Sequence, residues 1–426
     1  MSKQNKMIVT VFLVVVQFGG AYGAEWTQWR GPNFNGSTTE TNLPERWSQT
    51  ENVVWVAALP GGGGSTPIVR GDSVFISSQD GEGTTWAVGL NRKDGSVRWQ
   101  HAIGTGFHNR QGNTAASPSP IADGKNVYFL YGSGDFVGIS NQGKPLWKRN
   151  LTADHGEFEI LWDYGSSGML LEDKIYVPVI HGHHRNTAQD KSYILCVDPK
   201  TGKDLWKRDR RTDATYESKQ AYTTPYPLKV SGQTNIYITG GDYITAHDPK
   251  TGKALYRSES HNPNNIRYGR TVVSPVSVDG VILQPAPRGG SIYAAKLGAK
   301  GEISPWIWIM RQNSPDVCTP LVYRGKFYIL NGVGKKLLCV EPRNGKVLGQ
   351  CDLEGRTKFQ ASPTGGDGKI YCINMRGEAF VLSATDTPTI LHRVDMDGKD
   401  CRSTIAIAGG QLFIRVDDRL YCIGKK

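Results

Sequence analysis

The 426-residue chain has few cysteines and none of the short motifs that carry common enzyme chemistry. Its seven Cys all follow residue 195, and no two of them are adjacent or form a CxxC pair. HExxH, nucleophile-elbow and phosphate-loop patterns are also absent. These absences argue against a disulfide-dense scaffold, a zinc protease, an α/β-hydrolase and a P-loop enzyme. The odd number of Cys leaves at least one free or paired with another molecule.

Long hydrophobic runs are missing beyond the N-terminus. Lys3 and Lys6 precede an apolar run at residues 7–18, and Ala21-Tyr22-Gly23 follows it. This order is typical of a signal peptide, so residues 1–23 are expected to be removed, with cleavage after Ala24 as second choice. The run is shorter than the roughly 20 residues of a membrane span, although an uncleaved anchor is the alternative. We expect a mature chain without a transmembrane segment, located in the periplasm or outside the cell.

The chain also lacks a compact block of Lys and Arg, although these residues outnumber Asp and Glu by 50 to 39. Removing Lys3 and Lys6 lowers the formal charge from +11 to +9. An exported basic protein meets acidic proteins or anionic cell-envelope polymers rather than nucleic acid. We expect a monomer with such a partner, the alternative being a solvated basic surface without a dedicated ligand.

What the chain does contain is a repeat. Residues 193–206 (YILCVDPKTGKDLW) predict a strand, a tight turn with Asp198, Pro199 and Gly202, and a second strand. This hairpin recurs, each time after a Ser/Thr-Pro lead pair, or a variant of it, and an apolar-aromatic strand. The second residues of the lead pairs fall at positions 67, 120, 168, 225, 275, 320, 363 and 404. The spacing is that of four-stranded propeller blades.

The repeat count predicts an all-β fold, an eight-bladed β-propeller of four-stranded antiparallel blades. The eighth copy lacks its fourth strand, and residues 52–59, with Trp55, supply one before the first copy. Pairing the two would close the ring and hide two sheet edges. The alternative is seven blades with one copy misread. Residues 52–426 then form the propeller, and residues 24–51 form an arm whose three Trp predict packing on it rather than disorder.

The repeat resembles the pyrroloquinoline-quinone (PQQ) type propeller repeat of quinoprotein alcohol dehydrogenases and BamB-like outer-membrane assembly lipoproteins. The lead pairs and Asp198-x-x-Thr201-Gly202-Lys203-x-x-Trp206 carry the resemblance. Two further segments, Trp29-Arg30-Gly31-Pro32 and residues 420–424, resemble those of a secreted bacterial branch of PQQ-like repeat proteins, which lacks an assigned activity. For the dehydrogenases the resemblance implies bound PQQ with Ca²⁺. This chain departs from them, because it lacks their adjacent Cys pair and a recognisable Glu, Asn and Asp set for Ca²⁺, and it lacks the lipidated Cys of the BamB-like proteins.

The loops between blades predict where a ligand would bind. In a propeller they share one face with the loops between second and third strands, opposite the Thr-Gly-Lys turns. Several are longer here than a turn needs, which often signals function. We predict a site for a small polar ligand or a peptide on this funnel face, the alternative being that the loops merely cover it. The candidate residues are His108, Arg110, His155, Glu157, Glu159, Trp162, Asp163, Arg211, Tyr216, Arg267 and Arg311.

His181-Gly182-His183-His184 is the densest metal-like cluster. Strand-like alternation would place His181 and His183 on one side, and imidazole suits Zn²⁺ or Cu²⁺. The third ligand would come from the preceding loop, which holds His155, Glu157 and Glu159. The alternative is an exposed polar loop that happens to be rich in His.

The positions of three Cys residues in the repeat indicate a role in packing rather than in catalysis. Cys196, Cys339 and Cys422 share one position of the third strand, where other copies carry Gly89, Ala246 and Ala294 or Ala295. A position that accepts Gly, Ala or Cys requires a small side chain. A disulfide among Cys318, Cys351, Cys372 and Cys401 is left open by the sequence.

Together these features favour an exported, non-catalytic propeller that binds or scaffolds at the cell envelope, with no catalytic residues and no cofactor. The alternative is a PQQ- or metal-dependent oxidoreductase that uses the central funnel, with PQQ and Ca²⁺ as its cofactors.

Overall fold

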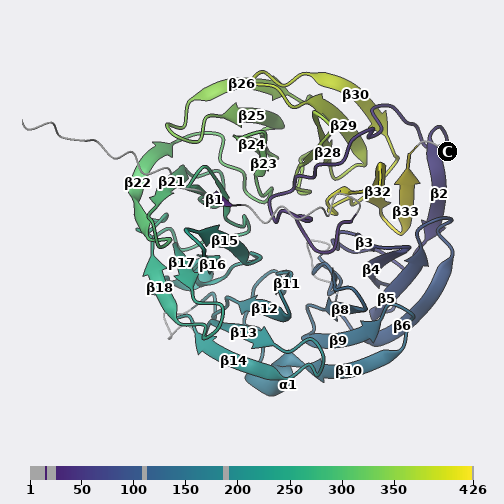
Figure 1. Cartoon of the computed structure of the whole chain (residues 1–426), viewed down its shortest axis with the longest axis horizontal. Coiled ribbons are helices and arrows are strands. Elements are labelled where there is room, and N and C mark those ends of the chain that lie inside the picture. Colours follow the sequence, from purple (N-terminus) through teal and green to yellow (C-terminus); the bar gives the residue numbers. More distant parts are fainter. Residues whose placement is uncertain (1–14, 17–24, 108–112, 186–190, 425–426) are drawn as a thin grey trace, which may run out of the picture.

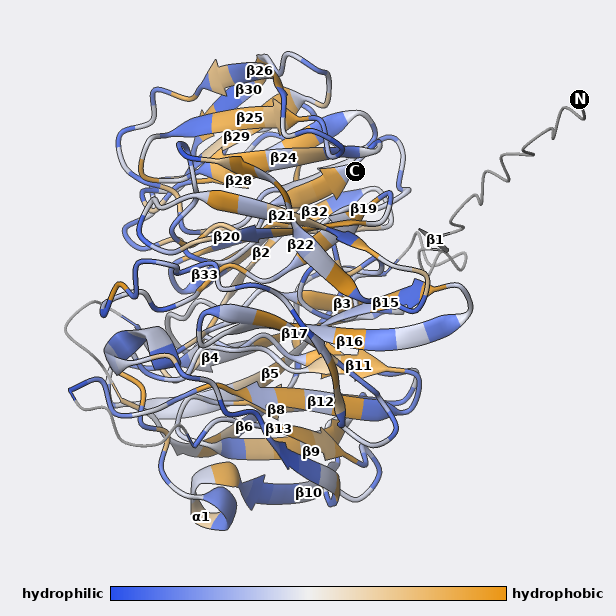
Figure 2. Cartoon of the chain, turned by 90° about the vertical axis from the view of Figure 1, so that its left-hand side faces the viewer, coloured by the Kyte–Doolittle hydropathy of each residue, from blue (hydrophilic) through white to orange (hydrophobic). Residues whose placement is uncertain are grey.

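The computed structural model describes residues 15–16, 25–107, 113–185 and 191–424. Its strands form eight antiparallel sheets set in a ring (Figure 1), which confirms the eight-bladed propeller and makes the seven-bladed alternative wrong. Within the described residues, helix is confined to α1 (Leu151–His155) and the 3-10 turn η1 (Tyr216–Lys219). None of these described helices is long and apolar enough to cross a membrane. Apolar strands fill the interior, and hydrophilic loops lie on both faces (Figure 2).

The first four blades each run outward from the axis in chain order. Blade 1 consists of β3 (Ile68–Arg70), β4 (Ser73–Gln79), β5 (Thr84–Asn91) and β6 (Val97–Thr105). Blade 2 consists of β7 (Ile121–Ala122), β8 (Asn126–Leu130), β9 (Asp135–Ser140) and β10 (Pro145–Asn150). Blade 3 consists of β11 (Met169–Leu171), β12 (Lys174–Val179), β13 (Tyr193–Val197) and β14 (Asp204–Asp209). Blade 4 consists of β15 (Tyr226–Val230), β16 (Gln233–Gly240), β17 (Tyr243–His247) and β18 (Ala254–Arg257), and the two-residue β1 (Val15–Val16) pairs with β15.

The other four blades repeat this order, except that the last borrows its outer strand. Blade 5 consists of β19 (Val276–Val278), β20 (Val281–Pro285), β21 (Ile292–Leu297) and β22 (Ile303–Met310). Blade 6 consists of β23 (Leu321–Tyr323), β24 (Lys326–Asn331), β25 (Lys336–Val340) and β26 (Val347–Asp352). Blade 7 consists of β27 (Thr364–Gly366), β28 (Lys369–Ile373), β29 (Glu378–Ser383) and β30 (Ile390–Asp395). Blade 8 consists of β31 (Ala406–Ala408), β32 (Gln411–Val416), β33 (Arg419–Ile423) and β2 (Val53–Ala58).

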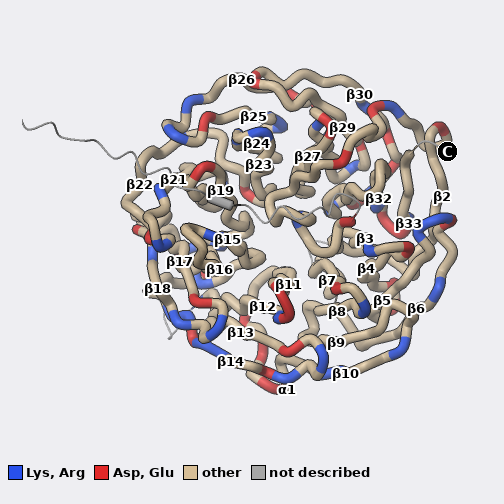
Figure 3. Tube along the Cα trace, viewed as in Figure 1, with Lys and Arg blue, Asp and Glu red and all other residues tan. Residues whose placement is uncertain are grey.

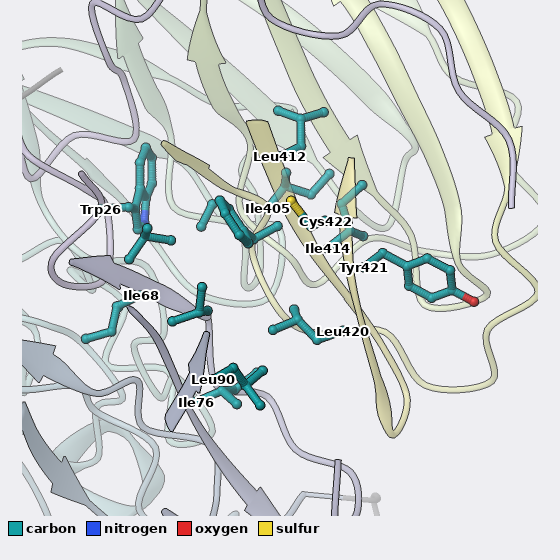
Figure 4. Packing of buried hydrophobic residues seen from close by; sticks show 14 of the residues in the cluster. Trp26, Ile68, Ile76, Leu90, Ile405, Leu412, Ile414, Leu420, Tyr421 and Cys422 are labelled. Atoms are coloured by element: carbon teal, nitrogen blue, oxygen red, sulfur yellow. The ribbon is translucent and has the colours of Figure 1, made fainter. Parts of the chain in front are cut away.

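The ring closes where β2 pairs antiparallel with β33, as the sequence predicted. Trp55 lies opposite Cys422 in this pair. Behind it, one apolar cluster continues from blade 8 into blade 1 and the arm (Figure 4). The buried guanidinium of Arg415 on β32 donates to the carbonyl oxygens of Ser77 and Gly61, at 2.8 Å each. The seam is therefore held by strand pairing, apolar packing and a buried cation.

The Ser/Thr of the lead pairs join neighbouring blades near the axis. The backbone N–H of Thr66 donates to the Ser119 hydroxyl, and the N–H of Ser119 donates to the Ser167 hydroxyl. The same bond links Thr224 to Ser274, Ser274 to Thr319, Thr319 to Ser362, and Thr404 to Thr66. A small hydroxyl side chain can accept such a bond where the inner strands converge. The recurring Ser/Thr is thus a structural feature of the ring.

The shared Cys position is a packing position, because it faces an aromatic residue on the strand next to it. Cys196 lies between Tyr176 on β12 and Trp206 on β14. At the equivalent Gly89 of blade 1, a Cβ atom would come within 2.4 Å of the outer-strand Trp99. All seven Cys are free thiols, and only Cys351 is partly exposed.

The arm, residues 25–51, crosses the centre of the ring on the face of the first-to-second-strand turns (Figure 1). Near its start, the N–H of Trp26 donates to the carbonyl of Val69 in blade 1. Farther on, the buried Arg30 donates to the carbonyl oxygens of Pro320 and Pro363, which precede the inner strands of blades 6 and 7. The arm therefore covers this end of the central channel.

Candidate functional site

A cavity of about 440 Å³ lies around the axis at the opposite end of the channel. The loops that precede the inner strands of blades 2 to 8 supply most of its wall. The lining residues are Asn113, Thr114, Ser117, Trp162, Asp163, Tyr164, Gly165, Tyr222, Arg270, Val272, Arg288, Asp316, Val317, Lys358, Gln360, Met375 and Arg402. A concave site with convergent polar groups at one end of a propeller is the default place for a ligand.

Arg270 and Asp316 form a bidentate ion pair in the cavity wall. Arg270 Nη1 lies 2.9 Å from Asp316 Oδ1, and Nη2 lies 3.1 Å from Oδ2. The N–H of Arg288 donates to the same Oδ1 at 2.9 Å. Burial would raise the pKa of Asp316, but the hydrogen bonds and charge of Arg270 outweigh it and hold that pKa below its ordinary value. Asp316 is thus an anion whose two oxygens are already engaged.

Glu217 stands behind the wall and holds two of the lining side chains. Its carboxylate is almost fully buried, at 1% exposure. Trp162 Nε1 donates to Glu217 Oε1 at 2.8 Å, and Arg288 Nη2 donates to Oε2 at 3.0 Å. The N–H of Trp162 donates to the Tyr222 hydroxyl at 3.1 Å. The aromatic and cationic parts of the wall are therefore fixed by the same carboxylate.

The charge of the wall is positive on balance. Arg270, Arg288, Lys358 and Arg402 line it, against the two carboxylates of Asp163 and Asp316. Elsewhere on the ring, basic and acidic residues are interspersed (Figure 3). The wall can therefore attract an anionic group, and the contacts of Arg270 with Asp316 and of Arg288 with Glu217 hold two of its cations in place.

Of the predicted funnel residues, Trp162 and Asp163 line this cavity. His108 and Arg110 lie outside the described residues. The remainder do not line the cavity: His155 at the end of α1, Tyr216 at the start of η1, and the loop residues Glu157, Glu159, Arg211, Arg267 and Arg311. Several of them have partners of their own. His155 Nε2 lies 3.0 Å from Asp204 Oδ2. Glu159 Oε1 lies 3.1 Å from Lys191 Nζ, and Arg211 Nη2 lies 3.0 Å from Asp209 Oδ2.

Tyr222, Arg270, Arg288, Asp316, Lys358 and Arg402 were missed by the sequence analysis. A positional signal for most of them exists. Tyr222, Arg270, Asp316, Lys358 and Arg402 all stand within four residues before a lead Ser or Thr. The end of an inter-blade loop therefore marks the cavity better than its middle. Arg288 has no such signal, because it belongs to the loop between β20 and β21.

The predicted metal pair does not converge. His181 is buried, and its Nδ1 accepts the backbone N–H of Glu159 at 3.1 Å, while Nε2 faces the carbonyl of Lys191 at 3.3 Å. His183 is exposed and stacks on His184 at 5.3 Å between ring centroids. Within the described residues, no group of three His, Cys, Asp or Glu side chains could hold a metal ion. Both nitrogens of His181 are thus committed to backbone groups.

The residues of the cavity can also be compared with what PQQ and Ca²⁺, the cofactors of the quinoprotein alcohol dehydrogenases, would require. Calcium in proteins takes six to eight oxygen ligands, largely from carboxylates. Here Asp316 gives both oxygens to Arg270, and the described residues contain no group of three His, Cys, Asp or Glu side chains that could hold a metal ion. The cavity does not fit Ca²⁺. Its cations would fit the carboxylates of a quinone, as they would fit any other carboxylate.

A family model described as outer membrane protein assembly factor BamB matches residues 46–189 and 190–426. Among curated protein sequences, none matches significantly. A europium-containing methanol dehydrogenase is similar in structure, with 12% identity, a TM-score of 0.68, and 93% of this chain and 91% of that chain covered. BamB from Moraxella catarrhalis is similar at 15% identity and a TM-score of 0.57, with 88% of this chain and 97% of that chain covered. At these identities the two structures show a common fold alone.

Proposed function

Because the chain belongs to the family of outer membrane protein assembly factor BamB, as its repeats predicted, we propose that it is an exported, non-catalytic binding or scaffolding module of the cell envelope. It acts from the periplasm or the outer surface. Its partner is a protein or an envelope polymer, and the funnel cavity receives an anionic group of that partner.

The observation that carries this proposal is the wall of the cavity. Four cationic side chains line it, and one of its carboxylates, Asp316, is held by Arg270 at 2.9 Å and 3.1 Å. Arginine is well suited to hold carboxylate and phosphate groups. Such a site can bind an anion without a metal or a nucleophile. It therefore favours binding over chemistry.

The competing proposal is a PQQ-dependent oxidoreductase. The cations of the wall support it, since PQQ carries carboxylates. The poor fit for Ca²⁺ and the missing adjacent Cys pair count against it. Purification from cells supplied with PQQ and Ca²⁺ separates the two. Stoichiometric PQQ together with dye-linked alcohol oxidation would overturn the binding proposal.

The binding proposal is tested by reversing the cavity charge in the double variant Lys358→Glu/Arg402→Glu. Lys358 is exposed, but Arg402 donates to Asp400 and Asn113, so far-UV circular dichroism of the variant must first show the wild-type fold. The wild-type protein should retain a component of an envelope extract that the variant does not retain. Equal retention by both proteins would contradict a role for the cavity. N-terminal sequencing of the protein recovered from the envelope fraction tests export, with Ala24 expected as the first residue.

A further inference from the structure

Three exposed apolar side chains stand on the loops that lead into the cavity wall on the funnel face. Leu161 is 37% exposed, Ile266 is 53% exposed and Tyr268 is 63% exposed. We call them the apolar rim. Leu161 immediately precedes Trp162 of the cavity wall, and Ile266 and Tyr268 lie shortly before Arg270. Apolar side chains that cluster next to a polar site mark an interaction surface.

The apolar rim is held in place by one structural element, the 3-10 turn η1. The N–H of Leu161 donates to Gln220 Oε1 at 2.9 Å, immediately after this turn. The Ser218 hydroxyl donates to the carbonyl oxygen of Ile266. The carbonyl oxygen of Tyr268 accepts a bond from Arg288, which also binds Glu217 of the turn. The rim therefore keeps its shape without a partner, which lowers the entropy cost of binding.

Charged side chains of both signs flank the apolar rim. The acids Glu157, Glu159 and Asp163 are close to Leu161 in the chain, whereas Arg267 and Arg288 flank Ile266 and Tyr268. The guanidinium of Arg267 lies over the Tyr216 ring at 4.6 Å from its centroid, and Arg288 is 46% exposed. A partner that packs on Ile266 and Tyr268 and reaches the cations of the cavity wall would therefore bring both apolar groups and negative charge.

From this juxtaposition we infer that the apolar rim and the cavity together bind an extended acidic polypeptide segment. An aromatic or aliphatic side chain of the segment packs on Ile266 and Tyr268, and its carboxylates enter the cavity towards Lys358 and Arg402. An anionic polysaccharide would supply the charge but not the apolar side chains. This inference rests on the proposed function and names its partner class.

The test is fluorescence anisotropy with labelled peptides on the full mature chain. The main probe is a short peptide rich in Asp and Glu that carries two Phe. One control peptide has Ser in place of each Phe, and a second has Lys in place of each acid. Polygalacturonate is the polysaccharide competitor. The protein variants are Ile266→Ser/Tyr268→Ser, Lys358→Glu/Arg402→Glu and the control Val97→Ser, which changes a 51% exposed side chain on β6.

Wild type and Val97→Ser should bind the main probe equally. The rim variant should bind it about tenfold more weakly, which corresponds to about 1.4 kcal/mol, and the Ser peptide should show a similar loss on wild type. Equal binding of the Phe and Ser peptides, a rim variant that binds like wild type, or stronger binding of polygalacturonate would each overturn the inference. In each of these cases the proposed function survives if Lys358→Glu/Arg402→Glu still abolishes retention of the envelope component. It fails with the inference if that variant retains the component as wild type does.

Discussion

The indole Nε1 of Trp147, on the outer strand of blade 2, donates a hydrogen bond of 2.8 Å to the carbonyl oxygen of Pro199 in blade 3. The ring also covers Gly202 of the same turn, where a Cβ would come within 2.6 Å of it. Other blades repeat the bond: Trp55 donates to Arg92, Trp99 to Asn141, and Trp308 to Pro342. In these four cases the turn between the third and fourth strands receives the Trp of the preceding blade, so this part of the repeat signature describes contacts between blades.

Trp147→Phe should lower the free energy of unfolding by about 1 kcal/mol, because it removes the hydrogen bond and keeps most of the ring packing. Trp147→Ala should cost about 3 to 5 kcal/mol, since it also leaves a cavity between two blades. Urea unfolding followed by far-UV circular dichroism measures both values. A Phe variant as stable as wild type would mean that the Pro199 bond contributes nothing.

Gly138→Ala should destabilise the protein by about 1 to 3 kcal/mol through overpacking. The added Cβ would lie 2.6 Å from atoms of the Trp147 ring, within the small-residue position of blade 2. Gly81→Ala is the matched control, because nothing lies within 4 Å of its added Cβ. The control should stay within about 0.5 kcal/mol of wild type. Equal midpoints of thermal unfolding for the two variants would contradict the steric account.

Arg415→Met should lower the free energy of unfolding by about 3 kcal/mol, because it leaves the buried carbonyl oxygens of Ser77 and Gly61, at the seam between blades 8 and 1, without their charged donor. Burial lowers the pKa of Arg415 to about 10, so the guanidinium is still charged at neutral pH. Chemical unfolding provides the measurement. Arg419→Met, on the neighbouring strand, serves as control, since that guanidinium only lies over the Tyr421 ring. A similar small loss in both variants would rule out a special role for Arg415.

Asp242→Asn should change how stability depends on pH. Burial, together with the charge of Asp213, raises the pKa of Asp242 to about 7 against a hydrogen bond from Asn262. The folded state then binds a proton that the unfolded state has lost, so the contribution of Asp242 to wild-type stability falls as pH rises from about 4 to about 7 and is level above that range. The neighbouring His261 stays neutral in the folded state over this range, because burial lowers its pKa to about 3.

The free energy of unfolding of Asp242→Asn minus that of wild type should therefore increase as pH rises from about 4 to about 7, by at most about 1.4 kcal/mol for each pH unit. Unfolding free energies of the two proteins at pH 5 and pH 8 provide the measurement. Because the difference between variant and wild type is compared, contributions of other titrating groups cancel. A difference that is the same at both pH values would show that Asp242 titrates normally.

The fold could be predicted in detail because each blade repeats the same contacts in the same order along the chain. The lead hydroxyls and the turns between third and fourth strands recur because they make the same contacts at several junctions between blades, and Trp55 identified the borrowed strand of blade 8. These signals are local and periodic, which is what a single sequence shows best.

The site could be predicted only as a face of the ring, and of the candidates named there Trp162 and Asp163 line the cavity. Arg270, Lys358 and Arg402 come from three loops of different blades, and they meet only because those loops converge on the axis. Their shared position within four residues before a lead Ser or Thr is the trace of this convergence in the sequence, and it can be interpreted only once the lead pairs are known to lie at the axis. His181 was predicted as a metal ligand because of its neighbours in the sequence. In the structure a backbone N–H and a backbone carbonyl occupy its two ring nitrogens, and the sequence does not reveal these contacts.

The closing pair of strands also sets how the ring would yield to force. Val53 lies opposite Ile423, so the chain leaves β2 and β33 at the same end of their pairing. Tension applied between residues 52 and 424 would break the backbone hydrogen bonds between β2 and β33 one after another, beginning at that end, because the force would not be shared among them. The ring should therefore open by unzipping rather than by shear, at a lower force than strands whose ends leave in opposite directions.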